Sequence, residues 1–263
     1  METSTRLMQS SNEDLKETIN RIGIMRNKSL QNKCEHGQSV MWCPVCKGEK
    51  ILSMWEQHLT KDIDPSKSGI PRRYWGCSLD TFEGNPKLVN ECRSYIEGGM
   101  VLSGNTGCGK THLAISLMKE YEYRKKLKGY ERNKAMIHEN PEGMYSPTTI
   151  RMKFITIPDL LLEIRSSFKE SSSIQSEESI IDEYTEITFL VLDDLGSEKT
   201  SEYAITTLYI ILDRRDREMM DTIITTNLSL AMVEEKLSAR IASRMAGMKN
   251  IKINMHDYRK KRG

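Results

Sequence analysis

Residues 104–111, with the sequence GNTGCGKT, have the spacing GxxxxGK[ST] of a phosphate-binding loop. Glycine lets such a loop curl so that successive amide groups point at a polyphosphate, and a following helix adds its positive N-terminal end. Lys110 would neutralise the outer phosphates, and the hydroxyl of Thr111 would ligate magnesium. The residues expected to contact the nucleotide are Gly104, Asn105, Thr106, Gly107, Cys108, Gly109, Lys110, Thr111 and His112.

Two acids end the apolar run FLVLDDLG, residues 189–196. Asp193 is expected to hold the magnesium ion through water, and Asp194 to orient or deprotonate the attacking water. Paired acids at the end of a strand could instead only cap the next helix. Aspartate is one methylene shorter than the glutamate usual at the second position, so the metal role of Asp193 is the firmer of the two predictions.

Three further polar side chains follow in the sequence. Asn227 ends the apolar segment TIITTN, where it could bind the attacking water or the terminal phosphate, or cap a helix. Arg240 and Arg244 are four residues apart and therefore share one face of a predicted helix. Such a pair could be a solvated surface or could reach the nucleotide of a neighbouring subunit as an arginine finger.

A second kind of chemistry is suggested by the segment CEHGQSVMWCPVC. Cys34, His36, Cys43 and Cys46 lie within 13 residues and could surround one zinc ion tetrahedrally. Cys34 and His36 are closer together than is usual for a zinc site, so unrelated buried cysteines are the alternative. The remaining cysteines, Cys77, Cys92 and Cys108, have no metal-like spacing and are expected to be structural.

Composition limits the class of protein. With 38% hydrophobic and 29% charged residues among 263, neither wholesale disorder nor a membrane protein is indicated. No apolar stretch approaches the roughly 20 residues that cross a bilayer, and the N-terminus lacks the core of a signal peptide, so we expect a cytosolic protein. The net charge of +2 is too small to indicate nucleic acid, although residues 249–263 form a basic tail.

The chemistry-bearing residues are carried by alternating strands and helices, which predict an α/β fold with a central parallel sheet. Ahead of it, residues 13–31 have the spacing of an amphipathic helix, and residues 51–59 of a second helix. The polar stretch 61–73 is interpreted as a linker, which gives an N-terminal zinc-binding domain at 1–65 and a nucleotide-binding domain at 66–263. The expected strands are 98–104, 152–157, 188–196 and 222–227, and the expected helices 110–127, 158–168, 201–218 and 229–245.

Five segments in this order, GNTGCGKTHLA, FLVLDDLGSE, LDRR, IITTN and KLSARIASRM, resemble the AAA+ ATPases of the DnaC/IstB family. That family comprises bacterial and phage helicase loaders and transposition helper ATPases. The resemblance runs from about Gly69 to the end and implies a P-loop α/β domain that assembles into an open ring or spiral, with ATP at subunit interfaces. By analogy Arg240 is the finger, Arg244 a second interface arginine, and Arg259 a sensor of the phosphates in cis.

The resemblance implies an ATP-dependent loader of the hexameric replicative DNA helicase onto single-stranded DNA, in the bacterial cytosol and of phage or prophage type. Its cofactors would be ATP, Mg²⁺ and Zn²⁺. Residues 13–31 could grip the helicase or pack on the zinc module. In the serine-rich segment 166–179, Phe168 and Lys169 could contact single-stranded DNA, or the segment could be an idle loop.

Two alternatives to loading remain: an IstB-like transposition helper ATPase, and a switch that binds ATP with negligible hydrolysis. The charged stretch 124–151 is expected to be a surface insertion or a partner contact.

Overall fold

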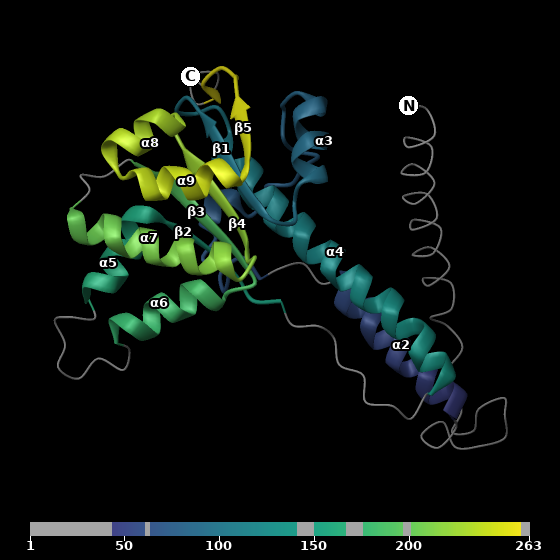
Figure 1. Ribbon diagram of the computed structural model, residues 1–263. Helices are drawn as coiled ribbons and strands as arrows, with labels where there is room; N and C mark the ends of the chain where they lie inside the picture. Colours follow the sequence, from purple (N-terminus) through teal and green to yellow (C-terminus); the bar gives the residue numbers. More distant parts are fainter. Residues whose placement is uncertain (1–43, 61–63, 141–149, 167–175, 197–200, 259–263) are drawn as a thin grey trace. The chain divides into compact units, whose positions relative to one another are not determined.

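The computed structural model describes residues 44–60, 64–140, 150–166, 176–196 and 201–258 (Figure 1). The chain divides into two compact units. The smaller unit comprises Met1–Ser53 and Ala135–Tyr145, and the larger comprises Met54–Lys134 and Ser146–Gly263.

In the smaller unit, the structure describes the first part of helix α2 (Pro44–Thr60) and the last turn of helix α4 (Lys110–Glu139). Helix α2 begins at Pro44, a position where the missing amide hydrogen does no harm. The second cysteine of the CPVC segment, Cys46, therefore lies in the first turn of a helix.

A five-stranded sheet forms the centre of the larger unit (Figure 1). Its strands run in the order β2-β3-β4-β1-β5, and all four neighbouring pairs are parallel. This confirms the predicted α/β class with a central parallel sheet. The strands are β1 (Gly99–Gly104), β2 (Met152–Thr156), β3 (Phe189–Leu195), β4 (Asp221–Thr226) and β5 (Lys249–Ile253).

Helices connect the strands, and serine begins most of the later ones. Ser176, Ser201, Ser229 and Ser238 each accept a hydrogen bond from an amide three residues on, which satisfies a donor that the first helical turn leaves unpaired. Besides α2 and α4, the helices are η1 (Arg72–Tyr74), α3 (Pro86–Ser94), α5 (Ile157–Ser166), α6 (Glu177–Glu186), α7 (Glu202–Arg217), α8 (Leu230–Lys236) and α9 (Ala239–Gly247).

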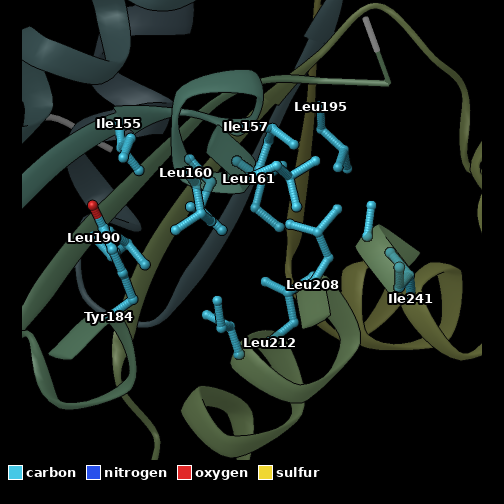
Figure 2. Packing of buried hydrophobic residues seen from close by; sticks show 14 of the residues in the cluster. Ile155, Ile157, Leu160, Leu161, Tyr184, Leu190, Leu195, Leu208, Leu212 and Ile241 are labelled. Carbon is cyan, nitrogen blue, oxygen red and sulfur yellow. The ribbon is translucent and has the colours of Figure 1, made fainter. Parts of the chain in front are cut away.

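Two apolar clusters, one on each face of the sheet, hold the helices in place. One cluster joins the strands to α3, α4 and the segment before α3. The other joins them to α5 through α9, and Figure 2 shows Leu208 and Leu212 of α7 together with Leu160 and Leu161 of α5 in this cluster. Because strand residues alternate between faces, Val101 belongs to one cluster, whereas Met100 and Leu102 belong to the other.

The predicted linker 61–73 is only partly a linker. Ser68 and Ile70 are buried, and the amide of Phe154 on edge strand β2 donates to the Ser68 carbonyl at 2.8 Å. Gly69 has φ +72, and a side chain there would meet the Phe154 carbonyl oxygen at 2.4 Å. The second half of this segment therefore covers a strand edge, which would otherwise present unpaired backbone groups.

Other predicted bounds were also wrong. Helix α4 continues to Glu139, so much of the charged stretch 124–151 is helical. The helix predicted over 229–245 is two helices, because Ser238 begins α9 after the break that follows Lys236. The tail predicted from Lys249 begins with β5, and α6 was not predicted.

Several predictions lie outside the described residues: the helix at 13–31, Cys34, His36 and Cys43, the pair Phe168 and Lys169, and Arg259. Within the described ranges, no helix is long and apolar enough to cross a membrane. No group of three or more His, Cys, Asp or Glu that could hold a metal ion was found among those residues either.

Candidate functional site

The loop from Gly104 to Thr111 joins the end of β1 to the start of α4, as the motif predicts. Gly107 and Gly109 have φ values of +77 and +93, a region that other residues rarely adopt. A side chain at Gly109 would also lie 2.9 Å from Cε2 of the buried Phe82. The backbone can therefore follow this path only with glycine at these positions.

Lys110 is a buried cation at the centre of the loop, with 6% of its surface exposed. Its Nζ donates to the carbonyl oxygens of Gly104 and Asn105, both at 3.0 Å, and to Oδ1 of Asn227 at 2.5 Å. All three acceptors are neutral. The carboxylate of Asp193 is near enough to interact electrostatically with this ammonium group. A buried cation whose hydrogen-bond acceptors are neutral still favours a further anion in direct contact, since burying a poorly compensated charge is costly.

Asp193 faces the first turn of α4 from the end of β3. Its two carboxylate oxygens lie 3.0 and 3.1 Å from Oγ1 of Thr111, and Oδ1 accepts a hydrogen bond from Oγ1 of Thr225 at 2.6 Å. Burial raises the pKa of Asp193, and the hydrogen bonds from Thr225 and Thr111 partly oppose that rise. A threonine hydroxyl beside one carboxylate is a fitting pair for Mg²⁺, which usually takes few protein ligands and completes its shell with phosphate and water.

Asp194 differs from Asp193 in exposure because strand β3 is irregular at this point. The register between β3 and β4 shifts between Leu192 and Leu195, and Asp194 has φ +63. Its amide donates to Oγ1 of Thr225 at 3.0 Å. This bulge leaves Asp193 buried and Asp194 exposed, although the two are neighbours in sequence.

Thr225 was missed by the sequence analysis. It is fully buried in β4, between β3 and β1, and its hydroxyl joins the Asp193 carboxylate to the Asp194 amide. A threonine pair before Asn227 in TIITTN was the available signal, because a hydroxyl in an otherwise apolar central strand needs a partner.

His112 was predicted to contact the nucleotide, and the structure places its ring toward the segment before α3. Nε2 lies 3.2 Å from the Ser78 carbonyl oxygen and 3.3 Å from Oγ1 of Thr81, and the ring meets Phe82 edge-on. Burial lowers the pKa of His112, which keeps the ring neutral at pH 7. The contacts are those of a residue that fastens this segment to α4.

The free cysteines of the described chain, Cys77, Cys92 and Cys108, are all buried. Burial raises the pKa of the Cys92 thiol to about 12. A thiol with so high a pKa is unreactive, in agreement with the structural role expected for it.

Arg240 and Arg244 lie on α9 and contact α7. The guanidinium of Arg240 lies 5.5 Å from the ring centre of Tyr209. Arg244 donates to Oδ1 of Asp213 from Nη2 at 2.6 Å and from Nε at 3.0 Å, and its Nη1 lies 3.4 Å from Asp216. These residues line a surface hollow of about 280 Å³ formed by Tyr209, Ala239, Arg240, Ser243 and Arg244.

Comparisons with known proteins bear on the family. No protein-family model matches the chain. Replicative helicase loader DnaC of Escherichia coli (strain K12) is 24% identical over 190 residues, which cover 68% of this chain and 67% of DnaC. The DnaC of Buchnera aphidicola subsp. Baizongia pistaciae (strain Bp) is 24% identical over 208 residues, covering 74% of each chain. The chain is similar to the DnaC-type replicative helicase loaders. This confirms the resemblance predicted from the motifs.

Solved structures agree on the fold. The crystal structure of a DnaC helicase loader has a TM-score of 0.51 and 23% identity, and the match covers 70% of this chain and all of that one. The replication initiator DnaA bound to AMPPCP and single-stranded DNA has the same TM-score with 18% identity, covering 71% of this chain and 51% of DnaA. The parallel sheet and its helices therefore have the fold seen in the DnaC and DnaA structures.

Proposed function

We propose that the chain is an ATPase that binds ATP and Mg²⁺ at the ends of β1, β3 and β4. The observation that carries this proposal is Lys110, a buried cation in the phosphate-binding loop whose hydrogen-bond acceptors are all neutral. A polyphosphate would supply negative charge in direct contact with Lys110, beside the charge of Asp193. DnaA, which shares the fold, is described bound to the ATP analogue AMPPCP.

Each residue of this site has a distinct proposed role. The loop amides and Lys110 would bind the phosphates, and Thr111 and Asp193 would hold Mg²⁺. Bound Mg²⁺ supplies charge neutralisation at the phosphates. Thr225 orients the Asp193 carboxylate by its 2.6 Å hydrogen bond.

Asp194 and Asn227 are proposed to act on the water that attacks the terminal phosphate. Both side chains are exposed at the ends of neighbouring strands, where a nucleophile could enter. In α/β sheets of this kind ligands bind outside the carboxyl ends of the strands. Asn227 accepts a hydrogen bond from Lys110, so its side chain lies close to the phosphates that Lys110 is proposed to bind.

The reaction is tested by phosphate release from ATP in the presence of Mg²⁺. We expect Lys110→Ala and Asp193→Ala to remove most of the activity, and labelled ATP to bind saturably to the wild-type chain. If the three proteins release phosphate at indistinguishable rates, the enzyme proposal fails. Saturable binding with no turnover would instead support the alternative of an ATP-binding switch.

We further propose that the chain loads the replicative helicase onto single-stranded DNA. The support is similarity to proteins named replicative helicase loader DnaC, over about two thirds of both chains. A complex with a hexameric replicative helicase in ATP and Mg²⁺ is expected, and its mass would also give the number of bound subunits. Absence of a stable complex, together with binding along duplex DNA, would favour a transposition helper ATPase.

Assembly into a ring or spiral would place Arg240 and Arg244 opposite the nucleotide of a neighbouring subunit. Both belong to one face of α9, where Arg244 donates to Asp213 and Arg240 lies over the Tyr209 ring. Arg259 is proposed to contact the phosphates within its own subunit.

The zinc site at Cys34, His36, Cys43 and Cys46 is retained as a proposal. It rests on the ligand types and their spacing in the sequence. Metal analysis of the purified protein is expected to find about one zinc per chain and less after Cys43→Ser. A wild-type value well below one equivalent that Cys43→Ser leaves unchanged would exclude the site.

A further inference from the structure

The residues Met255–Tyr258, here termed the C-terminal strap, cross the phosphate-binding loop after strand β5. Met255 packs against the apolar cluster that contains α4. At the other end, the Tyr258 amide donates to the Gly107 carbonyl at 3.0 Å. The Tyr258 hydroxyl donates to the Glu83 carbonyl at 2.7 Å and lies 3.0 Å from Oε2 of the same residue. The strap is therefore held by contacts at both of its ends.

Between these two anchors, the carboxylate of Asp257 lies directly against Gly107. A Cβ atom built on this glycine would be 1.8 Å from Oδ1, 2.4 Å from Cγ and 3.0 Å from Oδ2 of Asp257. The carboxylate thus takes the space that a side chain at position 107 would need. Glycine is required here by this close approach as well as by its φ of +77.

The position of this charge matters because the loop attracts anions. Backbone amides of a curled glycine loop and the start of a helix create positive potential, which α4 and Lys110 strengthen here. A carboxylate placed in that potential is stabilised by it. The same carboxylate repels a polyphosphate that approaches the same amides.

We propose that Asp257 is an affinity-determining residue of the nucleotide site. Its carboxylate competes with the phosphates for the positive potential of the loop, so that nucleotide binds with displacement of the C-terminal strap. This inference rests on the proposed ATP binding. It adds a regulatory role for the strap. An interaction that keeps the strap away from Gly107 strengthens nucleotide binding, and one that keeps the strap on Gly107 weakens it.

The test is a titration of the full-length chain with labelled ATP and Mg²⁺, comparing the wild type with Asp257→Asn. Asparagine keeps the shape of the side chain and removes its charge. We expect the Kd to fall on the order of tenfold at low salt, because one like charge near the phosphates is removed. The difference should shrink as salt approaches about 1 M, since screening then acts within a few ångströms. A merely structural role for Asp257 would not give this salt dependence.

Two further variants complete the design. Tyr258→Phe keeps the Asp257 charge but removes the hydrogen bonds to Glu83, and it should also tighten ATP binding, by a smaller factor. Asp182→Asn makes the same chemical change on α6, where Asp182 pairs with Arg214, and should leave the Kd unchanged. Thermal unfolding of each variant establishes that it is folded.

The outcomes separate the inference from the proposed function. If the wild type binds ATP and Asp257→Asn binds it equally or more weakly, the inference is overturned and the strap holds the nucleotide instead of competing with it. If neither protein binds ATP, the proposed nucleotide site fails, and the inference fails with it. Binding by Asp257→Asn that exceeds that of the wild type supports both.

Discussion

Asp193 has a carboxylate that is 5% exposed and whose pKa is raised by burial. Because its pKa is higher in the folded than in the unfolded chain, the folded chain binds this proton more tightly. The resulting stabilisation is present at pH values below the unfolded pKa and is lost as the pH rises through the folded pKa. At neutral pH the ionised carboxylate therefore destabilises the nucleotide-free protein.

We accordingly expect Asp193→Asn to raise the midpoint of thermal unfolding at pH 7 without nucleotide, because a buried charge is replaced by a neutral amide. ATP turnover should fall on the order of 10- to 100-fold, as for other residues that hold a metal through water. Differential scanning calorimetry and phosphate release measure the two effects. A lower midpoint than that of the wild type would contradict the argument from burial.

Gly109 offers a test of loop geometry, since alanine there would adopt an unfavourable φ of +93 and approach Phe82. We expect Gly109→Ala to lower the free energy of unfolding by about 1–3 kcal/mol and to abolish saturable ATP binding. Urea denaturation measures the first effect. Gly76→Ala is the matched control: nothing lies within 4 Å of the added methyl group, so the change should stay within about 0.5 kcal/mol.

At the scale of elements, Arg215 joins the end of α6 to the start of β4. It is 1% exposed, and its Nη1 donates to the carbonyl oxygens of Tyr184 and Thr185 in the last turn of α6 and of Ile187 directly after it. Its Nη2 donates to the Asp221 carbonyl at 2.7 Å. Burial lowers the pKa of Arg215 to about 10, so the guanidinium remains charged at pH 7.

Arg214, next to Arg215 in the sequence, provides a matched control for the role of Arg215 at this junction. We expect Arg215→Met to lower the free energy of unfolding by about 3–5 kcal/mol, because several buried carbonyl groups lose their donor. Arg214→Met removes only a half-exposed pair with Asp182 at 2.7 Å and should cost at most about 1 kcal/mol. Equal effects in urea denaturation would show that the buried hydrogen bonds are not what stabilises this junction.

At the scale of the whole molecule, the proposed assembly predicts that the site is shared between subunits. Arg240→Ala and Arg244→Ala should each lower ATP turnover while leaving ATP affinity within about twofold, because the arginines act on a neighbour's nucleotide. Mixing either variant with Asp193→Asn chains should raise the turnover above that of either variant alone, since some interfaces then combine an intact arginine with an intact metal site. No recovery on mixing, measured by phosphate release, would place these arginines outside a shared site.

Some elements of the structure could be predicted from the sequence, and others could not. The four strands 98–104, 152–157, 188–196 and 222–227 were found within a residue or two, because apolar central strands have a strong local signal. Strand β5 was missed because its exposed positions carry lysine and asparagine, as suits an edge strand, and only its pairing with β1 makes it a strand. Helix α6 was not predicted because the serine-rich segment 166–179, which includes its first residues, was interpreted as a loop.

By itself, the sequence determined the phosphate-binding loop, the acids of β3 and the alternation of strands and helices, because each depends on residue types at fixed local spacing. Only the tertiary structure decided that Thr225 holds Asp193, that Phe82 lies behind Gly109, and that Asp257 lies on Gly107. These contacts join residues 27 to 150 positions apart in the chain. No local sequence pattern predicts contacts between residues so far apart. Such contacts depend on the order of the strands in the sheet and on where the chain continues after β5.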